Sequence, residues 1–108
     1  MYLLFGVRAD TLVKARVLVE DLLGIQLYGR EGLHNGGEYF RARLPDYSLK
    51  LRENIDLDDI EREAHGLEEP DFPEFTWLLY VDGIDDRHPT LRVLEQKTDI
   101  LKMLRAVD

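Results

Sequence analysis

The chain has 108 residues, no cysteine, and 22 acidic against 14 basic residues, which gives a formal net charge of −8. This length fits one domain with its own core, and a hydrophobic content of 44% fits a folded chain rather than a disordered one. Disulfides and thiolate chemistry are excluded, while the acidic balance argues against nucleic acid and anionic membrane surfaces as partners.

The apolar runs give no sign of export or of membrane insertion. The start of the chain has no basic leader and no evident cleavage site after its short apolar run. No apolar run approaches the roughly 20 residues that span a bilayer. Because the missing cysteines also suit a reducing cytosol, we expect a cytoplasmic protein.

The first half of the chain is predicted to form one strand, one helix and three further strands. Residues 2–9 are a short apolar run typical of a buried strand. Asp10 is a candidate N-cap for a helix that ends before Gly24. Further strands are expected at residues 25–30, 38–44 and 47–52, with a glycine-rich turn at 31–37 and a second turn at Pro45 and Asp46.

Strands 38–44 and 47–52 alternate apolar and basic residues, so their pairing would gather four cations on one face of the sheet. We call these residues the basic strip: Arg41, Arg43, Lys50 and Arg52. Three interpretations stay open for this strip. It is a solvated sheet face, it partly neutralises the acidic residues that follow it, or it holds an anionic ligand.

Residues 53–74 form what we call the acidic segment, because nearly all of the excess negative charge lies there. The segment contains ten acidic residues and one basic residue, a net charge of −9, whereas the rest of the chain holds 13 basic and 12 acidic residues. Asp56 is a candidate cap for a short helix over residues 57–65, and Gly66 would end it. Residues 67–73 contain two prolines and are predicted to form an extended, exposed loop.

The last third of the chain predicts a strand and a helix. Residues 75–81 (FTWLLYV) are strongly apolar and predict a central strand. Pro89 is expected to open a final helix, with His88 or Asp86 near its cap. The inner stripe of this helix is predicted from Leu91, Leu94, Thr98, Leu101 and Leu104.

The predicted element order is β-α-β-β-β-(short α)-β-α within a single domain over residues 1–108. This order favours the α+β class, with a mixed or antiparallel sheet of about five strands and two main helices on one face.

Motifs for catalysis or metal binding are missing from the sequence. The histidines at positions 34, 65 and 88 stand in no pattern with a carboxylate and a nucleophile. The acids from Asp56 to Glu61 suggest calcium only superficially, because the glycine and the glutamate that an EF-hand loop requires are absent. We therefore predict no catalytic residues, no metal and no cofactor.

The first half of the chain resembles the β-α-β-β-β module of the glyoxalase and bleomycin-resistance superfamily. The similarity lies in residues 15–37 (ARVLVEDLLGIQLYGREGLHNGG) and in the strand that ends Leu51-Arg52-Glu53. The resemblance implies a small-molecule-binding or metal-dependent enzyme domain, and because half of that fold leaves an open sheet edge, we expect it to dimerise. Glu53 matches the family's glutamate ligand, but residues 2–9 offer no ligand, which weighs against metal-dependent lyase or dioxygenase chemistry.

The chain as a whole resembles the immunity proteins of bacterial toxin systems, including contact-dependent growth inhibition, in its small size, acidity and lack of cysteine. This resemblance implies a non-enzymatic immunity protein or antitoxin that binds a basic toxin domain, often a nuclease. A surface of one sign speeds association with a partner of the other, and an aromatic anchor supplies affinity. The alternative for the segment is a solvated cover over the sheet. The residues predicted to contact the toxin are Asp56, Asp58, Asp59, Glu61, Glu63, Glu68, Glu69, Asp71 and Phe72.

Overall fold

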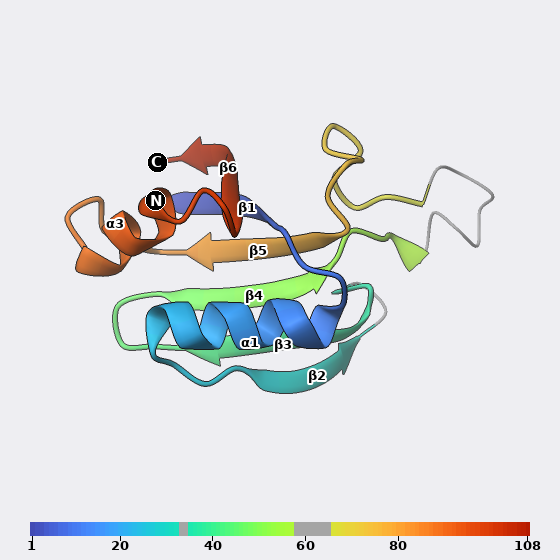
Figure 1. Cartoon of the computed structure of the whole chain (residues 1–108), viewed down its shortest axis with the longest axis horizontal. Helices are drawn as coiled ribbons and strands as arrows, with labels where there is room; N and C mark the ends of the chain where they lie inside the picture. Colours follow the sequence, from blue (N-terminus) through green and yellow to red (C-terminus); the bar gives the residue numbers. More distant parts are fainter. Residues whose placement is uncertain (33–34, 58–65) are drawn as a thin grey trace.

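The computed structural model describes residues 1–32, 35–57 and 66–108, and these form an α+β domain with one antiparallel sheet and two helices (Figure 1). In the described residues the sheet has six strands in the order β2-β3-β4-β5-β1-β6. The elements, in chain order, are β1 (Tyr2–Val7), α1 (Leu12–Leu23), β2 (Tyr28–Gly32), β3 (Gly37–Arg43), β4 (Ser48–Glu53), β5 (Trp77–Asp82), α3 (Pro89–Gln96) and β6 (Leu101–Val107).

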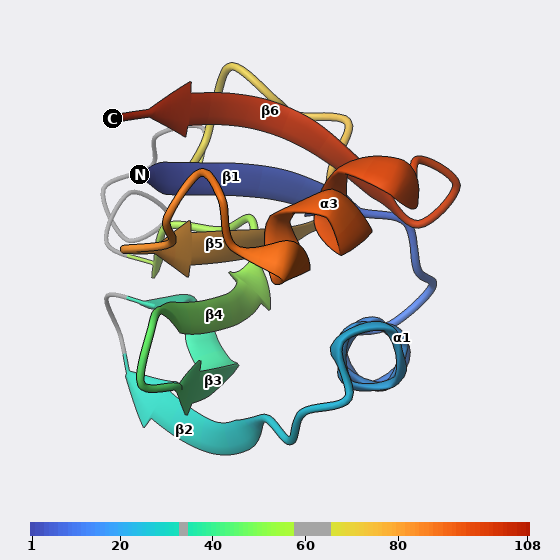
Figure 2. The same cartoon turned by 90° about the vertical axis from the view of Figure 1, so that its left-hand side faces the viewer.

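Both helices pack on the same face of the sheet (Figure 2). Helix α1 connects β1 to β2 at the far edge, and α3 connects β5 to β6, with β1 lying between these two strands. The α+β class, the two helices on one face and the central position of β5 are therefore confirmed. The sheet of about five strands that the sequence predicts has six in the described residues, because the end of the chain adds β6.

The main core lies between the sheet and the two helices. Alternate residues of each strand point to this face, as the period of a β-strand requires. Phe5, Leu51 and Leu79 are fully buried there, in one apolar cluster with Ala15 and Val19 of α1. Because every second residue of a strand points into this core, the residues between them, including the basic strip, point to the opposite face of the sheet.

Helix α1 begins one residue later than the sequence predicts. Thr11 rather than Asp10 is its N-cap, because the Thr11 hydroxyl accepts a hydrogen bond from the N–H of Lys14 at 3.1 Å. Gly24 ends the helix with φ of 64°, a left-handed conformation that glycine adopts without steric cost. His88 caps α3 as expected, since its ring nitrogen accepts from the N–H of Thr90.

The predicted continuation of the last helix to Leu104 is wrong. Helix α3 ends at Gln96, and a turn follows in which the N–H groups of Ile100 and Leu101 both donate to the carbonyl of Lys97. The chain then pairs with β1 as β6, from Leu101 opposite Val7 to Val107 opposite Tyr2. Leu101 is buried in either conformation, so leucine spacing alone does not separate them. The strand is favoured because it satisfies the otherwise open backbone edge of β1.

The short helix predicted over residues 57–65 falls almost entirely outside the described residues. Gly66, its predicted stop, has φ of 74°. Among the described residues no helix is both long and apolar enough to cross a membrane.

Candidate functional site

The outer face of the sheet, which we define as the face turned away from the helices, is divided into a covered half and an open half. In the covered half the aromatic ring of Phe75 lies directly on Gly6 of β1. A Cβ atom at position 6 would stand only 2.3 Å from this ring, so glycine is what permits the contact. Leu4, Leu78 and Phe75 form a second small core there, and Phe72 packs against it.

Asn54 attaches the acidic segment to the end of β4. Its side chain is 4% exposed, and its amide nitrogen donates to the carbonyls of Phe72 at 3.1 Å and Phe75 at 3.0 Å. Its side-chain oxygen accepts from the N–H of Glu69 at 2.8 Å. One buried amide thus satisfies several backbone groups of the returning chain, which otherwise would be costly to bury.

These bonds overturn the expectation of an extended, exposed loop over residues 67–73. The N–H of Phe72 donates to the carbonyl of Glu69, and the N–H of Phe75 donates to the carbonyl of Phe72, so the chain forms turns against the sheet. The two prolines lie on the exposed side of these turns. Sequence reasoning missed the loop's attachment, because it depends on Asn54, a residue distant from the loop in sequence.

Arg52 is the member of the basic strip that does not face solvent, contrary to the sequence-based prediction. Its side chain is 2% exposed, and its guanidinium donates to the carbonyls of Glu53 at 3.2 Å and Ile55 at 2.6 Å. It also lies 3.7 Å from the carboxylate of Glu68. The returning segment covers Arg52, so this cation holds the first and last parts of the acidic segment together.

Glu69 is the second link between the segment and the sheet. Its carboxylate accepts two hydrogen bonds from Arg105 of β6, at 2.8 and 3.2 Å, and one from the hydroxyl of Tyr80 at 2.8 Å. Burial alone would raise the pKa of Glu69, but the bonds from Arg105 and Tyr80 outweigh burial and hold the pKa below its usual value. Burial, together with the bond to Glu69, raises the pKa of Tyr80.

The predicted toxin-contacting residues therefore divide into groups. Asp58, Asp59, Glu61 and Glu63 lie outside the described residues. The remaining ones are described at Asp56, Glu68, Glu69, Asp71 and Phe72. Of these five, only Asp71 is exposed; the others are partly covered, and the carboxylate of Glu69 is used within the fold.

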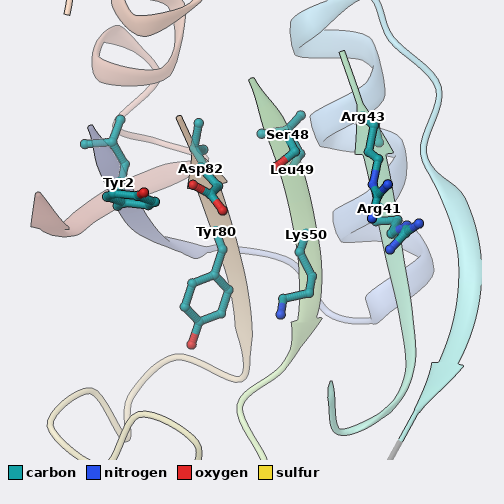
Figure 3. Close-up of a pocket in the computed structure, with 11 residues that line it drawn as sticks. Tyr2, Arg41, Arg43, Ser48, Leu49, Lys50, Tyr80 and Asp82 are labelled. Atoms are coloured by element: carbon teal, nitrogen blue, oxygen red, sulfur yellow. The ribbon is translucent and has the colours of Figure 1, made fainter. Parts of the chain in front are cut away.

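The open half of the outer face contains a hollow of about 290 Å³ (Figure 3). Arg41 and Arg43 of β3, Lys50 of β4 and Tyr80 of β5 contribute side chains to it from neighbouring strands. Tyr2, Ser48 and Asp82 complete the polar and aromatic lining. Figure 3 shows Arg41 and Arg43 on one side of the hollow and the two tyrosines on the other, with Lys50 between them.

Lys50 lies between Tyr80 and the two arginines of β3 (Figure 3). Its ammonium donates to the side-chain oxygen of Asn35 at 2.8 Å and lies 5.5 Å from the centre of the Tyr80 ring. Partial burial, followed by repulsion from Arg52, lowers the pKa of Lys50. Among the described residues neither Arg41 nor Arg43 forms an ion pair.

Over the described residues no group of three or more histidine or acidic side chains is arranged to hold a metal ion. Glu53, which the glyoxalase resemblance matches to a ligand, stands at the end of β4 opposite Trp77. Comparison of the chain with protein-family models, with curated proteins and with solved structures found no match. Function therefore rests on the residues themselves, and both family resemblances stay predictions.

Proposed function

We propose that this chain is a non-enzymatic immunity protein or antitoxin of a bacterial toxin system, which acts in the cytoplasm by binding a basic toxin domain. A nuclease is the partner that the class resemblance suggests. The proposal is carried by one observation: a segment with ten acidic residues and one basic residue is anchored to the sheet at its base. Such a surface attracts a basic partner and is partly organised before it binds.

The contacts at its two ends distinguish this segment from a solvated acidic tail. The N–H of Asp56 donates to the carbonyl of Gly66 at 2.7 Å, which brings the two ends of the intervening stretch together. Asn54 and Arg52 then attach both ends to β4. Because the ends are already fixed, binding costs less conformational entropy than the ordering of a free tail would.

The negative charge of this surface should raise its rate of association with a basic partner. Asp71 and Glu74 are exposed in the described part of the segment. Charges of one sign on a surface raise association rates with an oppositely charged partner by factors of about 10 to 10³, and salt reduces the effect. Glu69 is left out of the proposed contact surface, because its carboxylate already binds Arg105 and Tyr80.

Capture from extracts of the source cell tests the proposal, with identification of the bound proteins and of the protein encoded by the neighbouring reading frame. The wild-type chain is expected to retain a basic protein, more weakly as salt rises. The variant Asp71→Lys/Glu74→Lys should lose affinity, and the quadruple change of Asp58, Asp59, Glu61 and Glu63 to lysine should lose more.

A matched control makes the same change of charge elsewhere. Glu95 and Asp99 are exposed, in and just after α3, and α3 packs on the opposite face of the sheet. Glu95→Lys/Asp99→Lys should bind the partner nearly as well as the wild type. Equal binding by the segment variants and the wild type, or equal weakening by segment and control variants, would remove the acidic segment as the contact surface.

A further inference from the structure

The open half of the outer face places like charges side by side. Arg41 of β3 lies directly opposite Lys50 of β4, and Arg43 follows on the same strand and face. Like charges at directly opposed positions of a sheet destabilise it. Arg41 and Arg43 have no ion-pair partner in the part of the chain that the structure describes, so no direct ion pair at either arginine offsets this repulsion there.

The surroundings of Lys50 also leave its positive charge without a hydrogen-bonded carboxylate among the described residues. Its ammonium is partly removed from water, and the acceptor that it contacts is the uncharged amide of Asn35. Arg52, two residues along β4, faces the same side of the sheet and repels this ammonium, and the smaller attraction of Glu68 and Asp82 does not fully offset burial and this repulsion. An oxyanion in the hollow would meet two guanidinium groups and one ammonium, and charge-assisted hydrogen bonds to such groups are the strong ones.

The rest of the lining limits what fits beside that anion. Ser48 lies between Arg43 and Asp82 across three neighbouring strands, and Tyr2 follows Asp82 on the next strand. The carboxylate of Asp82 would repel a second anionic group but would accept a hydrogen bond from a hydroxyl or an ammonium. The tyrosine rings of Tyr2 and Tyr80 provide flat apolar surface beside this acceptor.

We propose that this hollow binds a small organic oxyanion, with Arg41, Arg43 and Lys50 holding its carboxylate or phosphate group and Asp82 accepting from a hydroxyl or amine at its other end. The hollow measures about 290 Å³, near the lower limit of small-molecule sites. A ligand with a few carbon atoms between anion and donor matches this size. This site is independent of the proposed toxin contact, since it needs none of the acids of the segment.

Titration of the intact protein with four probes, followed by the backbone amide signals in nuclear magnetic resonance spectra, tests the site. The probes are inorganic phosphate, glycerol phosphate, 3-hydroxybutyrate and the uncharged 3-hydroxybutyramide. We expect saturable shifts at the amides of β3, β4 and β5 around Arg41, Lys50 and Asp82. The comparison of glycerol phosphate with 3-hydroxybutyrate decides between phosphate and carboxylate. Inorganic phosphate should bind more weakly than glycerol phosphate, because it does not reach Asp82.

Two charge-removing variants decide whether the site or the overall charge is responsible. Arg41→Gln should lower the affinity of the best-binding probe by about tenfold, the loss expected for one charge-assisted hydrogen bond. Arg92→Gln removes the same charge from an exposed position on α3, which packs on the opposite face of the sheet, and should leave affinity unchanged. Without ligand, Arg41→Gln should also melt at a higher temperature than the wild type, because a repulsion is removed.

The same spectra show whether each variant is folded. If Arg41→Gln does not fold, Arg43→Gln takes its place and should also weaken binding of the best probe. The proposal is overturned if no anionic probe gives saturable shifts in the hollow, or if the uncharged amide binds as well as 3-hydroxybutyrate. It is equally overturned if Arg41→Gln and Arg92→Gln weaken binding to the same extent.

Discussion

The carboxylate of Glu69 and the guanidinium of Arg105 form a paired hydrogen bond that joins the acidic segment to the last strand of the chain, at 2.8 and 3.2 Å. The two residues are far apart in sequence, and Arg105 occupies an edge strand that leucine spacing predicts as helix. The pair also receives the hydroxyl of Tyr80 from β5. The most acidic part of the protein is thus fixed by a cation that lies outside it.

Glu69 should make stability depend on pH in the acidic range. Its pKa is lower in the folded chain than in the unfolded chain, so its stabilising effect is present above the unfolded pKa of about 4.3 and is lost as pH falls through the folded value. Glu69→Gln should lower the free energy of unfolding at neutral pH by about 1 kcal/mol. Between about pH 5 and 3 the variant should lose less further stability than the wild type, because it has no carboxylate at this position to protonate.

Urea unfolding at a series of pH values measures this effect. Glu74→Gln is the matched control, because Glu74 is exposed in the same segment. Its stability curve should follow that of the wild type. If the Glu69 variant also follows the wild type down to acidic pH, the carboxylate contributes nothing to folding.

Asn54 should be among the most sensitive polar positions in the protein. Truncation in Asn54→Ala leaves the carbonyls of Phe72 and Phe75 and the N–H of Glu69 without their partner. Unsatisfied buried groups cost about 1–3 kcal/mol each, and partial entry of water reduces the sum, so we expect a loss of about 3 kcal/mol. Asn35→Ala, which removes a single bond to Lys50, should cost less than about 1 kcal/mol. Chemical denaturation of both variants checks the order, and equal losses would contradict it.

Local patterns predict much of this fold. The period of two in β3 and β4 correctly places Arg41, Arg43 and Lys50 on one face, because each strand buries its alternate side chains in the core. Gly24 ends α1 as predicted, because a left-handed residue is a local requirement. Such features depend on neighbours in sequence, so the sequence alone is sufficient to find them.

The features that sequence analysis missed depend on contacts between distant residues. Arg52 has the same strand pattern as Lys50 but is buried, because residues after Gly66 return over it. Leu101 and Leu104 fit a helical stripe and a strand equally well, and the open edge of β1 decides between them. The spacing of residues along the chain therefore predicts neither the burial of Arg52 nor the strand at the end of the chain. The sequence left open that the basic strip partly neutralises the acidic segment, and Arg52 beside Glu68 agrees with that interpretation, whereas its burial was not predicted.

Gly6 should be needed for the attachment of the segment rather than for the strand that contains it. Gly6→Ala would drive a methyl group into the ring of Phe75, and such overpacking costs about 1–3 kcal/mol. Gly29→Ala on the edge strand β2 is the control, because the nearest atom to a Cβ there is 3.5 Å away. Thermal unfolding should show a loss for Gly6→Ala only. In the double variant Gly6→Ala/Phe75→Ala the two effects should be less than additive, since both disturb one contact.

The two arginines Arg52 and Arg43 provide the sharpest test of how the basic strip is divided. Both alternate outward by sequence, yet Arg52 is buried against the carbonyls of Glu53 and Ile55, while Arg43 is exposed. Arg52→Ala should lower the free energy of unfolding by about 3 kcal/mol, because it leaves buried acceptors unpaired. Arg43→Ala should change it by less than about 0.5 kcal/mol, as is usual for exposed positions. Urea titration of the two variants under identical conditions measures the difference. Similar losses would mean that Arg52 is solvated like its neighbours, and that the acidic segment is not held to β4 by this cation.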